Sequence, residues 1–144
     1  MSDSATRLHL RRQLEAHLIG LGYSFERLKG TATPVPEIVR ISPVRGRIAY
    51  GEVVAHGDLQ LRRCHARLLS FSQRRTRHRS TILFFIGVAE SDAAALRALL
   101  EELEICSGTR GGHVHVVPIA AAPERRRTAT ARRVKQNDQE RASS

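Results

Sequence analysis

The eight residues TILFFIGV, 81 to 88, constrain the fold more than any other stretch of this chain. Their length and apolar composition are typical of a strand that is buried on both faces. Such a strand needs covering elements on both sides of its sheet. The run is also far shorter than the roughly 20 apolar residues that a bilayer span requires, and no other run approaches that length.

Three amphipathic stretches can supply the covering helices. Leucines at steps of four, four and three predict a first helix over 6–21. Asp58 is a good N-cap for a second helix over about 59–71, and Ser91 or Asp92 can cap a third. The apolar stripes of the three helices are Leu10, Leu14, Leu18 and Leu21; Leu61, Cys64, Leu68 and Phe71; and Leu96, Leu99, Leu100 and Leu103.

Strand patterns complete the order of elements. Residues 37–41 and 47–54 are rich in β-forming side chains, and the turn SPVRG between them is short enough to make them antiparallel neighbours. Residues 113–119 predict a last strand, and residues 23–29 predict a short edge strand. Because helices separate the later strands, these should run parallel to a neighbour. The expected fold is α/β, with a central mixed sheet flanked by helices.

The length of 144 residues suits one domain, which we expect to span 1–122. Residues 124–144 hold seven bases and three acids, with no apolar side chain larger than valine. Residues 123–144 are therefore expected to form a basic tail that is disordered alone. Two isolated cysteines, Cys64 and Cys106, and an N-terminus without a signal-peptide pattern predict a cytoplasmic protein with reduced thiols.

Charge indicates the class of partner. The formal net charge is +10, which suggests a polyanionic partner, with a merely basic surface as the alternative. Seven arginines fall between residues 62 and 79 without an acid among them, and aromatic residues are only 4% of the chain. Such a segment predicts phosphate contacts on double-stranded DNA rather than base stacking on single strands. The seven are Arg62, Arg63, Arg67, Arg74, Arg75, Arg77 and Arg79.

Two acids in the hairpin are the candidate chemical site. A hairpin centred on 43–45 places residue 37 opposite roughly 51–53, so Glu37 and Glu52 can be cross-strand neighbours. Two carboxylates this close repel each other. A divalent cation would reverse that cost, because Mg²⁺ prefers oxygen ligands, and so would an arginine such as Arg40 or Arg47.

Pro36-Glu37, the hairpin and Glu52-Val53-Val54 together resemble the PD-(D/E)XK nuclease-like superfamily, whose motif is a proline-acid pair, a gap, then an acid, any residue and a lysine. The resemblance covers roughly residues 8–119. It implies a restriction-endonuclease-like αβββαβ core with an added helix and strand. It also implies that Glu37 and Glu52 bind Mg²⁺ for phosphodiester hydrolysis, that Glu15 is an additional acid, and that a homodimer is one assembly of the protein.

The chain departs from that motif at its third position, where Val54 replaces lysine. Valine cannot donate a hydrogen bond or stabilise a developing anion. Candidates for a relocated cation are Arg62, Arg63, His56 and Lys29, although arginine carries protons poorly because its pKa exceeds about 12. Either the cation has moved to another element, or catalysis has been lost while the fold has stayed.

Other polar groups have structural explanations. His113 and His115 alternate on one strand near Cys106, but their spacing fits no zinc pattern. The glycine-rich SGTRGG, 107–112, precedes a strand instead of a helix, so it fails as a phosphate loop. Cys64, beside His56 and His65, falls on the apolar stripe of its helix, where packing explains it.

Three functional hypotheses follow. The first is a DNA-binding nuclease-like protein that hydrolyses phosphodiesters with Mg²⁺. The second is a catalytically inactive accessory module of the same fold that binds nucleic acid or a protein. The third is a basic interaction domain whose target is an acidic protein.

Overall fold

The computed structural model describes residues 3–26, 32–44, 46–75, 81–105 and 113–122. Helices, short 3₁₀ turns and strands follow one another in the expected order. They are α1 (Asp3–Gly20), β1 (Phe25–Glu26), β2 (Ile38–Ile41), β3 (Ile48–Val54), η1 (His56–Gln60), α2 (Arg62–Ser72), β4 (Leu83–Ala89), η2 (Glu90–Asp92), α3 (Ala93–Glu102) and β5 (Val114–Ile119).

The five strands form one mixed sheet in the order β1-β2-β3-β4-β5. Strand β2 runs antiparallel to both of its neighbours, whereas β3, β4 and β5 are parallel to one another. Helices α2 and α3 make the two parallel crossovers, since a parallel connection needs a long return path. The expected α/β class, the antiparallel hairpin and the parallel later strands are confirmed.

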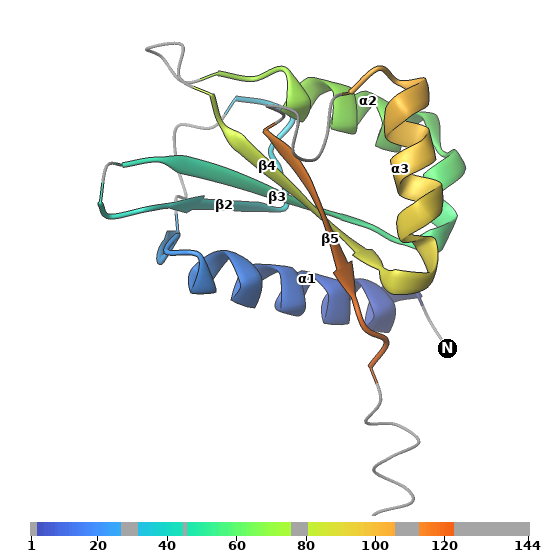
Figure 1. The fold of residues 1–144 in the computed structure, drawn as a ribbon, viewed down its shortest axis with the longest axis horizontal. Helices are drawn as coiled ribbons and strands as arrows, with labels where there is room; N and C mark the ends of the chain where they lie inside the picture. Colours follow the sequence, from blue (N-terminus) through green and yellow to red (C-terminus); the bar gives the residue numbers. More distant parts are fainter. Residues whose placement is uncertain (1–2, 27–31, 45, 76–80, 106–112, 123–144) are drawn as a thin grey trace, which may run out of the picture.

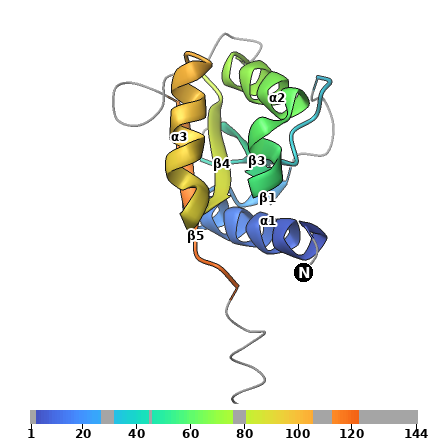
Figure 2. The ribbon, with the colours of Figure 1, turned by 90° about the vertical axis from the view of Figure 1, so that its right-hand side faces the viewer.

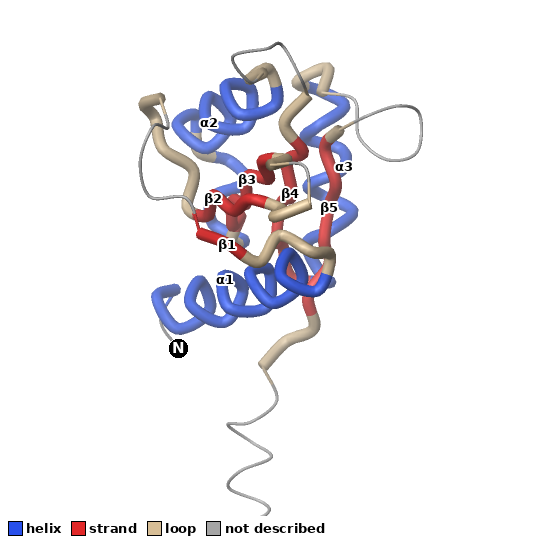
Figure 3. The backbone as a smooth tube through the Cα atoms, turned by 90° about the vertical axis from the view of Figure 1, so that its left-hand side faces the viewer, coloured by secondary structure: helices blue, strands red, loops and turns tan. Residues whose placement is uncertain are grey.

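Helices cover both faces of this sheet (Figure 1). Helix α1 lies across one face, and α2 and α3 lie side by side on the other (Figure 2). Seen from the opposite side, the strands form a layer between α1 and the α2/α3 pair (Figure 3). Two separate apolar clusters result, one under α1 and one under α2 and α3.

Strand β4 has the burial that its apolar run predicts. Its five interior residues, 84–88, are all buried. Phe84, Ile86 and Val88 belong to the cluster beneath α2 and α3, whereas Phe85 packs beneath α1. Successive side chains of a strand point to opposite faces, so a strand in the middle layer must be apolar at every position.

The hairpin register is the expected one. Ile38 lies opposite Gly51, and Val39 lies opposite Tyr50. The turn between the strands closes through a hydrogen bond from the Gly46 N–H to the Ser42 carbonyl, and Gly46 has a φ of 63°, which glycine adopts without strain. This register brings Glu37 and Glu52 to neighbouring positions.

Two element boundaries differ from the sequence expectation. Residue Asp58 does not cap α2, which starts at Arg62 after the short turn η1. Its carboxylate instead accepts the Ala55 N–H at 2.9 Å and binds Arg7, so the capping oxygen is already engaged one turn earlier. The edge strand β1 has two residues, both exposed, and β2 supplies its pairing.

Several predictions fall outside the described residues: the basic tail, Lys29, Arg77, Arg79, Cys106 and the SGTRGG segment. Among the helices that the structure describes, none combines the length and apolar character of a membrane span.

Candidate functional site

The candidate site begins where β3 extends past the start of β2. The register would place Pro36 opposite Val53, and proline has no N–H to continue the ladder. Side chains satisfy the exposed edge instead. The Glu37 carboxylate accepts the Val53 N–H at 3.2 Å, and the Arg7 guanidinium donates to the Val53 carbonyl at 3.3 Å. A glutamate and an arginine therefore replace the missing strand at this point.

Arg7 joins these groups to η1. Its Nη2 lies 3.0 Å from Glu37 Oε1, and its Nη1 donates to Asp58 Oδ2. Burial lowers the pKa of Arg7, but the hydrogen bonds and charges of Asp58 and Glu37 outweigh that effect and the pKa is raised. The guanidinium is therefore charged at any physiological pH and neutralises part of the charge of two carboxylates.

Glu52 is bound by an arginine of its own. Glu52 is only 5% exposed and lies on the face of the sheet that α2 covers. Arg67 donates from Nε to Oε2 at 2.5 Å and from Nη2 to Oε1 at 3.1 Å, a two-point contact typical of arginine with a carboxylate. Oε1 also accepts the Glu37 N–H at 3.1 Å. Both carboxylate oxygens of Glu52 are therefore occupied.

Burial dominates the electrostatics of this carboxylate. Desolvation raises the pKa of Glu52, and the Arg67 hydrogen bonds act in the opposite direction. The same contact raises the pKa of Arg67, chiefly through its hydrogen bond to Glu52. Burial, and after it the charges of Asp58 and Glu52, raise the pKa of Cys64 to about 11.

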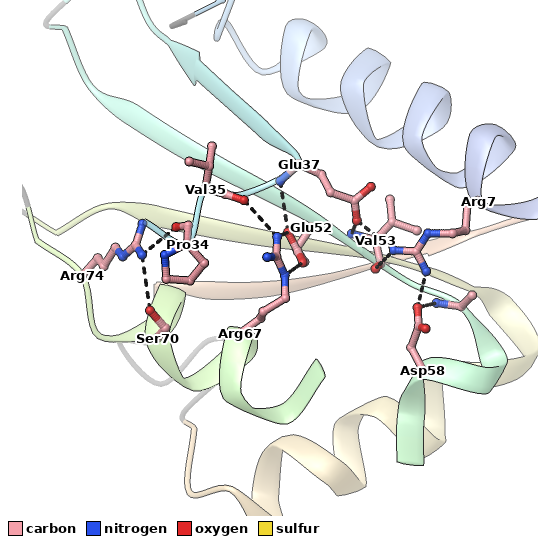
Figure 4. Close-up of polar contacts among 11 residues, drawn as sticks. Arg7, Pro34, Val35, Glu37, Glu52, Val53, Asp58, Arg67, Ser70 and Arg74 are labelled. Carbon is pink, nitrogen blue, oxygen red and sulfur yellow. Dashed lines mark hydrogen bonds and ion pairs between the residues drawn. The ribbon is translucent and has the colours of Figure 1, made fainter. Parts of the chain in front are cut away.

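Glu37 and Glu52 are neighbours along the sheet, but their carboxylates do not converge on one point. Figure 4 shows Glu37 reaching towards Arg7 on α1 and Glu52 reaching towards Arg67 on α2. The predicted cross-strand proximity is confirmed by the Glu37 N–H bond to Glu52. The arginines that relieve the repulsion are Arg7 and Arg67, from the two helices, and not Arg40 or Arg47 from the hairpin.

Glu15, the third acid, lies with a different partner. Its Oε2 is 2.8 Å from Nη1 of Arg40, which is 7% exposed. Arg40 also donates to the carbonyls of Tyr23 and Ser24. This arginine ties the end of α1 and the start of β1 to β2, so Glu15 neutralises a buried structural cation.

The carboxylates as arranged do not fit a Mg²⁺ ion. Mg²⁺ needs near-octahedral oxygen ligands and keeps several of its waters. Here each of the three acids already binds an arginine, and the one nearest the core is almost fully buried. Within the described part of the chain, no group of three or more His, Cys, Asp or Glu side chains is placed to hold a metal.

The five arginines of 62–79 that the structure describes separate into groups with different surroundings. Arg62 and Arg63 open α2 and are exposed, and neither side chain makes a hydrogen bond or ion pair with another described residue. Arg75 is exposed, and its side chain donates only to the carbonyl of Arg74 among the described residues. The side chains of Arg67 and Arg74 instead bind other parts of the chain, at Glu52 and at the Pro34 carbonyl. Two predicted phosphate ligands therefore stand free at the start of α2.

Arg74 holds the loop that precedes β2. It donates to the carbonyls of Ala32 at 3.1 Å and Pro34 at 2.7 Å. Its guanidinium also lies 5.0 Å from the centre of the Phe71 ring and 5.8 Å from that of Tyr50. Figure 4 shows Arg74 and Arg67 side by side along the loop, each with a carbonyl of residues 34–35 as an acceptor.

The histidines have partners within the chain. His113 contacts the Ser72 carbonyl, and His115 stacks on Phe85 with ring centres 5.0 Å apart. His56 binds Asp92 at 2.8 Å while its side chain is 86% exposed. His65 contacts the carbonyl of Leu59. A structural reading of these residues, and of Cys64 packed against the core, accounts for their contacts.

Sequence reasoning did not find Arg7 or the second role of Asp58. Arg7 precedes Leu10 by three residues and Leu14 by seven, so it lies on the same face of α1 as the leucine stripe, and 51 residues separate it from Asp58. The one available signal was the placement of this arginine on the apolar face of the helix. Comparisons with protein-family models, with curated proteins and with solved structures found no match.

Proposed function

We propose that this chain is a nuclease-like module that binds DNA and does not cleave it. The observation that carries the binding role is the pair Arg62 and Arg63, exposed at the start of α2 without partners among the described residues. The first turn of α2 holds no acid, so the positive end of the helix dipole adds to their charge. Phosphates are the acceptors that such a pair suits best.

The absence of cleavage follows from the state of the acids. Glu52 is held at two points by Arg67, and Val54 occupies the position where the resembling superfamily has lysine. Neither a free carboxylate pair nor the motif cation is therefore in place. The nuclease-like part of the proposal is supported by the α/β class, with a five-stranded mixed sheet between helices.

A binding assay with labelled duplex DNA tests the proposal. The Arg62→Ala/Arg63→Ala variant should bind more weakly, and the slope of log K against log salt should fall by roughly 2, one for each phosphate contact. Arg11→Ala/Arg12→Ala is the matched control, because it removes two adjacent arginines from α1 on the other face of the sheet. No retardation of DNA at low salt would overturn the proposal in favour of an acidic protein target.

Metal-dependent hydrolysis is the second candidate function. It is favoured by the adjacency of Glu37 and Glu52, because the Glu37 N–H donates to Glu52 Oε1 at 3.1 Å. Incubation of duplex DNA with Mg²⁺ or Mn²⁺, followed by electrophoresis, tests it. Cleavage by the wild type that is lost in Glu52→Gln would establish the second candidate and reject a non-cleaving module.

A further inference from the structure

We infer that the Arg67 guanidinium is the resident cation of the Glu52 carboxylate and holds the place that a divalent metal would need. The resemblance implies a metal for these acids, and the observed donor set disagrees with it. The inference rests on contacts within this chain and does not depend on DNA binding.

The geometry favours the guanidinium over an ion. Arg67 meets both oxygens of Glu52, at 2.5 and 3.1 Å, and the third acceptor site on that carboxylate takes the Glu37 N–H. Glu52 is 5% exposed, which leaves little room for the waters that Mg²⁺ retains. An intramolecular cation also competes at a high effective concentration.

Arg67 is itself held in place by other groups. Its Nη2 donates to the Val35 carbonyl at 2.9 Å, and its guanidinium lies 5.0 Å from the centre of the Phe71 ring. Three segments thus meet at one cation: α2, β3 and the loop before β2. Displacing Arg67 with a metal would break contacts to all three, so the arginine has a structural role that an exchangeable ion could not fill.

The two other candidate metal ligands, Glu37 and Glu15, are also paired with arginines. Glu37 binds Arg7 and Glu15 binds Arg40, each from a different element. No two of the three acids share an arginine among these contacts. A metal would need at least two of them turned towards one point.

A double-mutant cycle on thermal unfolding tests the inference. Arg67→Met keeps an apolar stem over Phe71 but leaves Glu52 buried and uncompensated, so its melting temperature should fall by on the order of 10 °C. Glu52→Gln alone should also destabilise the protein, because it leaves the Arg67 charge unpaired. The double variant Arg67→Met/Glu52→Gln should recover much of the loss, since it removes both charges together.

Arg74→Met is the matched control. Arg74 also lies over Phe71 and also donates to the loop before β2, but it binds no carboxylate among the described residues. Its effect should therefore add to that of Glu52→Gln without coupling. Wild-type protein should show the same melting temperature with and without millimolar Mg²⁺ or Mn²⁺ at equal ionic strength.

Either of two results with folded variants would overturn the inference. One is additivity of Arg67→Met and Glu52→Gln, which would mean that the pair is not energetically linked. The other is stabilisation of the wild type by Mg²⁺ or Mn²⁺ that Glu52→Gln abolishes, which would mean that a metal displaces Arg67. If Arg67→Met does not fold, a folded double variant supports the inference, and a double variant that also fails to fold contradicts it.

Discussion

At the scale of single residues, this molecule places carboxylates and arginines in specific pairs. A buried carboxylate is costly unless a cation and hydrogen-bond donors accompany it. Glu52, at 5% exposure, has both, from Arg67 and from the Glu37 N–H. Neutralisation from within the chain explains how a strand dense in apolar residues tolerates an acid.

The charge of Glu52 also affects the pKa of the Cys64 thiol. Its pKa is raised to about 11, first by burial and then by Asp58 and Glu52. Alkylation of Cys64 at pH 8 should therefore be at least roughly tenfold slower in the folded protein than in urea, because the thiolate is the reacting species. The rate should rise steeply towards about pH 11. Mass spectrometry of the Cys64 peptide separates it from Cys106.

The sign of the accompanying stability change follows from linkage. The unfolded thiol loses its proton near its ordinary pKa of 9.0, and the folded thiol only near 11. The unfolded state is therefore favoured as pH rises through that interval, and folding stability should fall there. An alkylation midpoint near pH 9 in the folded protein would contradict the raised pKa.

At the scale of elements, the close packing of α1 on the sheet depends on two glycines in the strands. A Cβ added at Gly51 would lie 3.0 Å from Ile38 Cβ and 3.2 Å from Leu14 Cδ2, and Gly87 is equally close to Leu14. The two glycines let the leucine stripe of α1 approach β3 and β4 closely. This contact keeps Arg7, on the same helix, within reach of Glu37.

Gly51→Ala should destabilise the protein by about 1–3 kcal/mol, because the added methyl group overpacks the interface between α1 and the sheet. Urea unfolding followed by circular dichroism measures the change. Gly57→Ala is the control, since a Cβ there meets no atom within 4 Å and φ is not in the left-handed region. Equal stability of the two variants would show that α1 does not need the close approach.

At the scale of the whole molecule, net charge decides long-range behaviour. Residues 124–144 contribute seven bases and three acids to a chain with a net charge of +10. Charges of this kind strengthen binding to polyanions without base specificity. If the proposed function holds, residues 1–122 and residues 123–144 should therefore contribute separately to DNA binding.

Deletion of residues 123–144 should weaken duplex binding at low salt and reduce the salt slope, by at most roughly 6 if each of the seven bases neutralises one phosphate. The melting temperature should stay within about 2 °C of wild type, because these residues include no apolar side chain larger than valine to bury. Unchanged affinity would assign all phosphate contacts to residues 1–122.

Local sequence pattern was sufficient for much of the fold. The apolar run of β4 predicted burial on both faces, the turn chemistry of 42–46 predicted the hairpin register, and the leucine spacing predicted α1 and α3. These features depend on periodicity and on residues close in the chain, which a sequence displays directly. The proximity of Glu37 and Glu52 followed from the same register.

Only the tertiary structure decided which cation each acid meets. Arg7 reaches Glu37 across 30 residues, and Arg40 reaches Glu15 across 25. Of the 24 basic residues, all but Lys29 and Lys135 are arginines, and their positions in the sequence do not specify which acid each one meets. The choice depends on where the helices rest on the sheet, because ion pairing acts between any side chains that packing brings within a few ångströms.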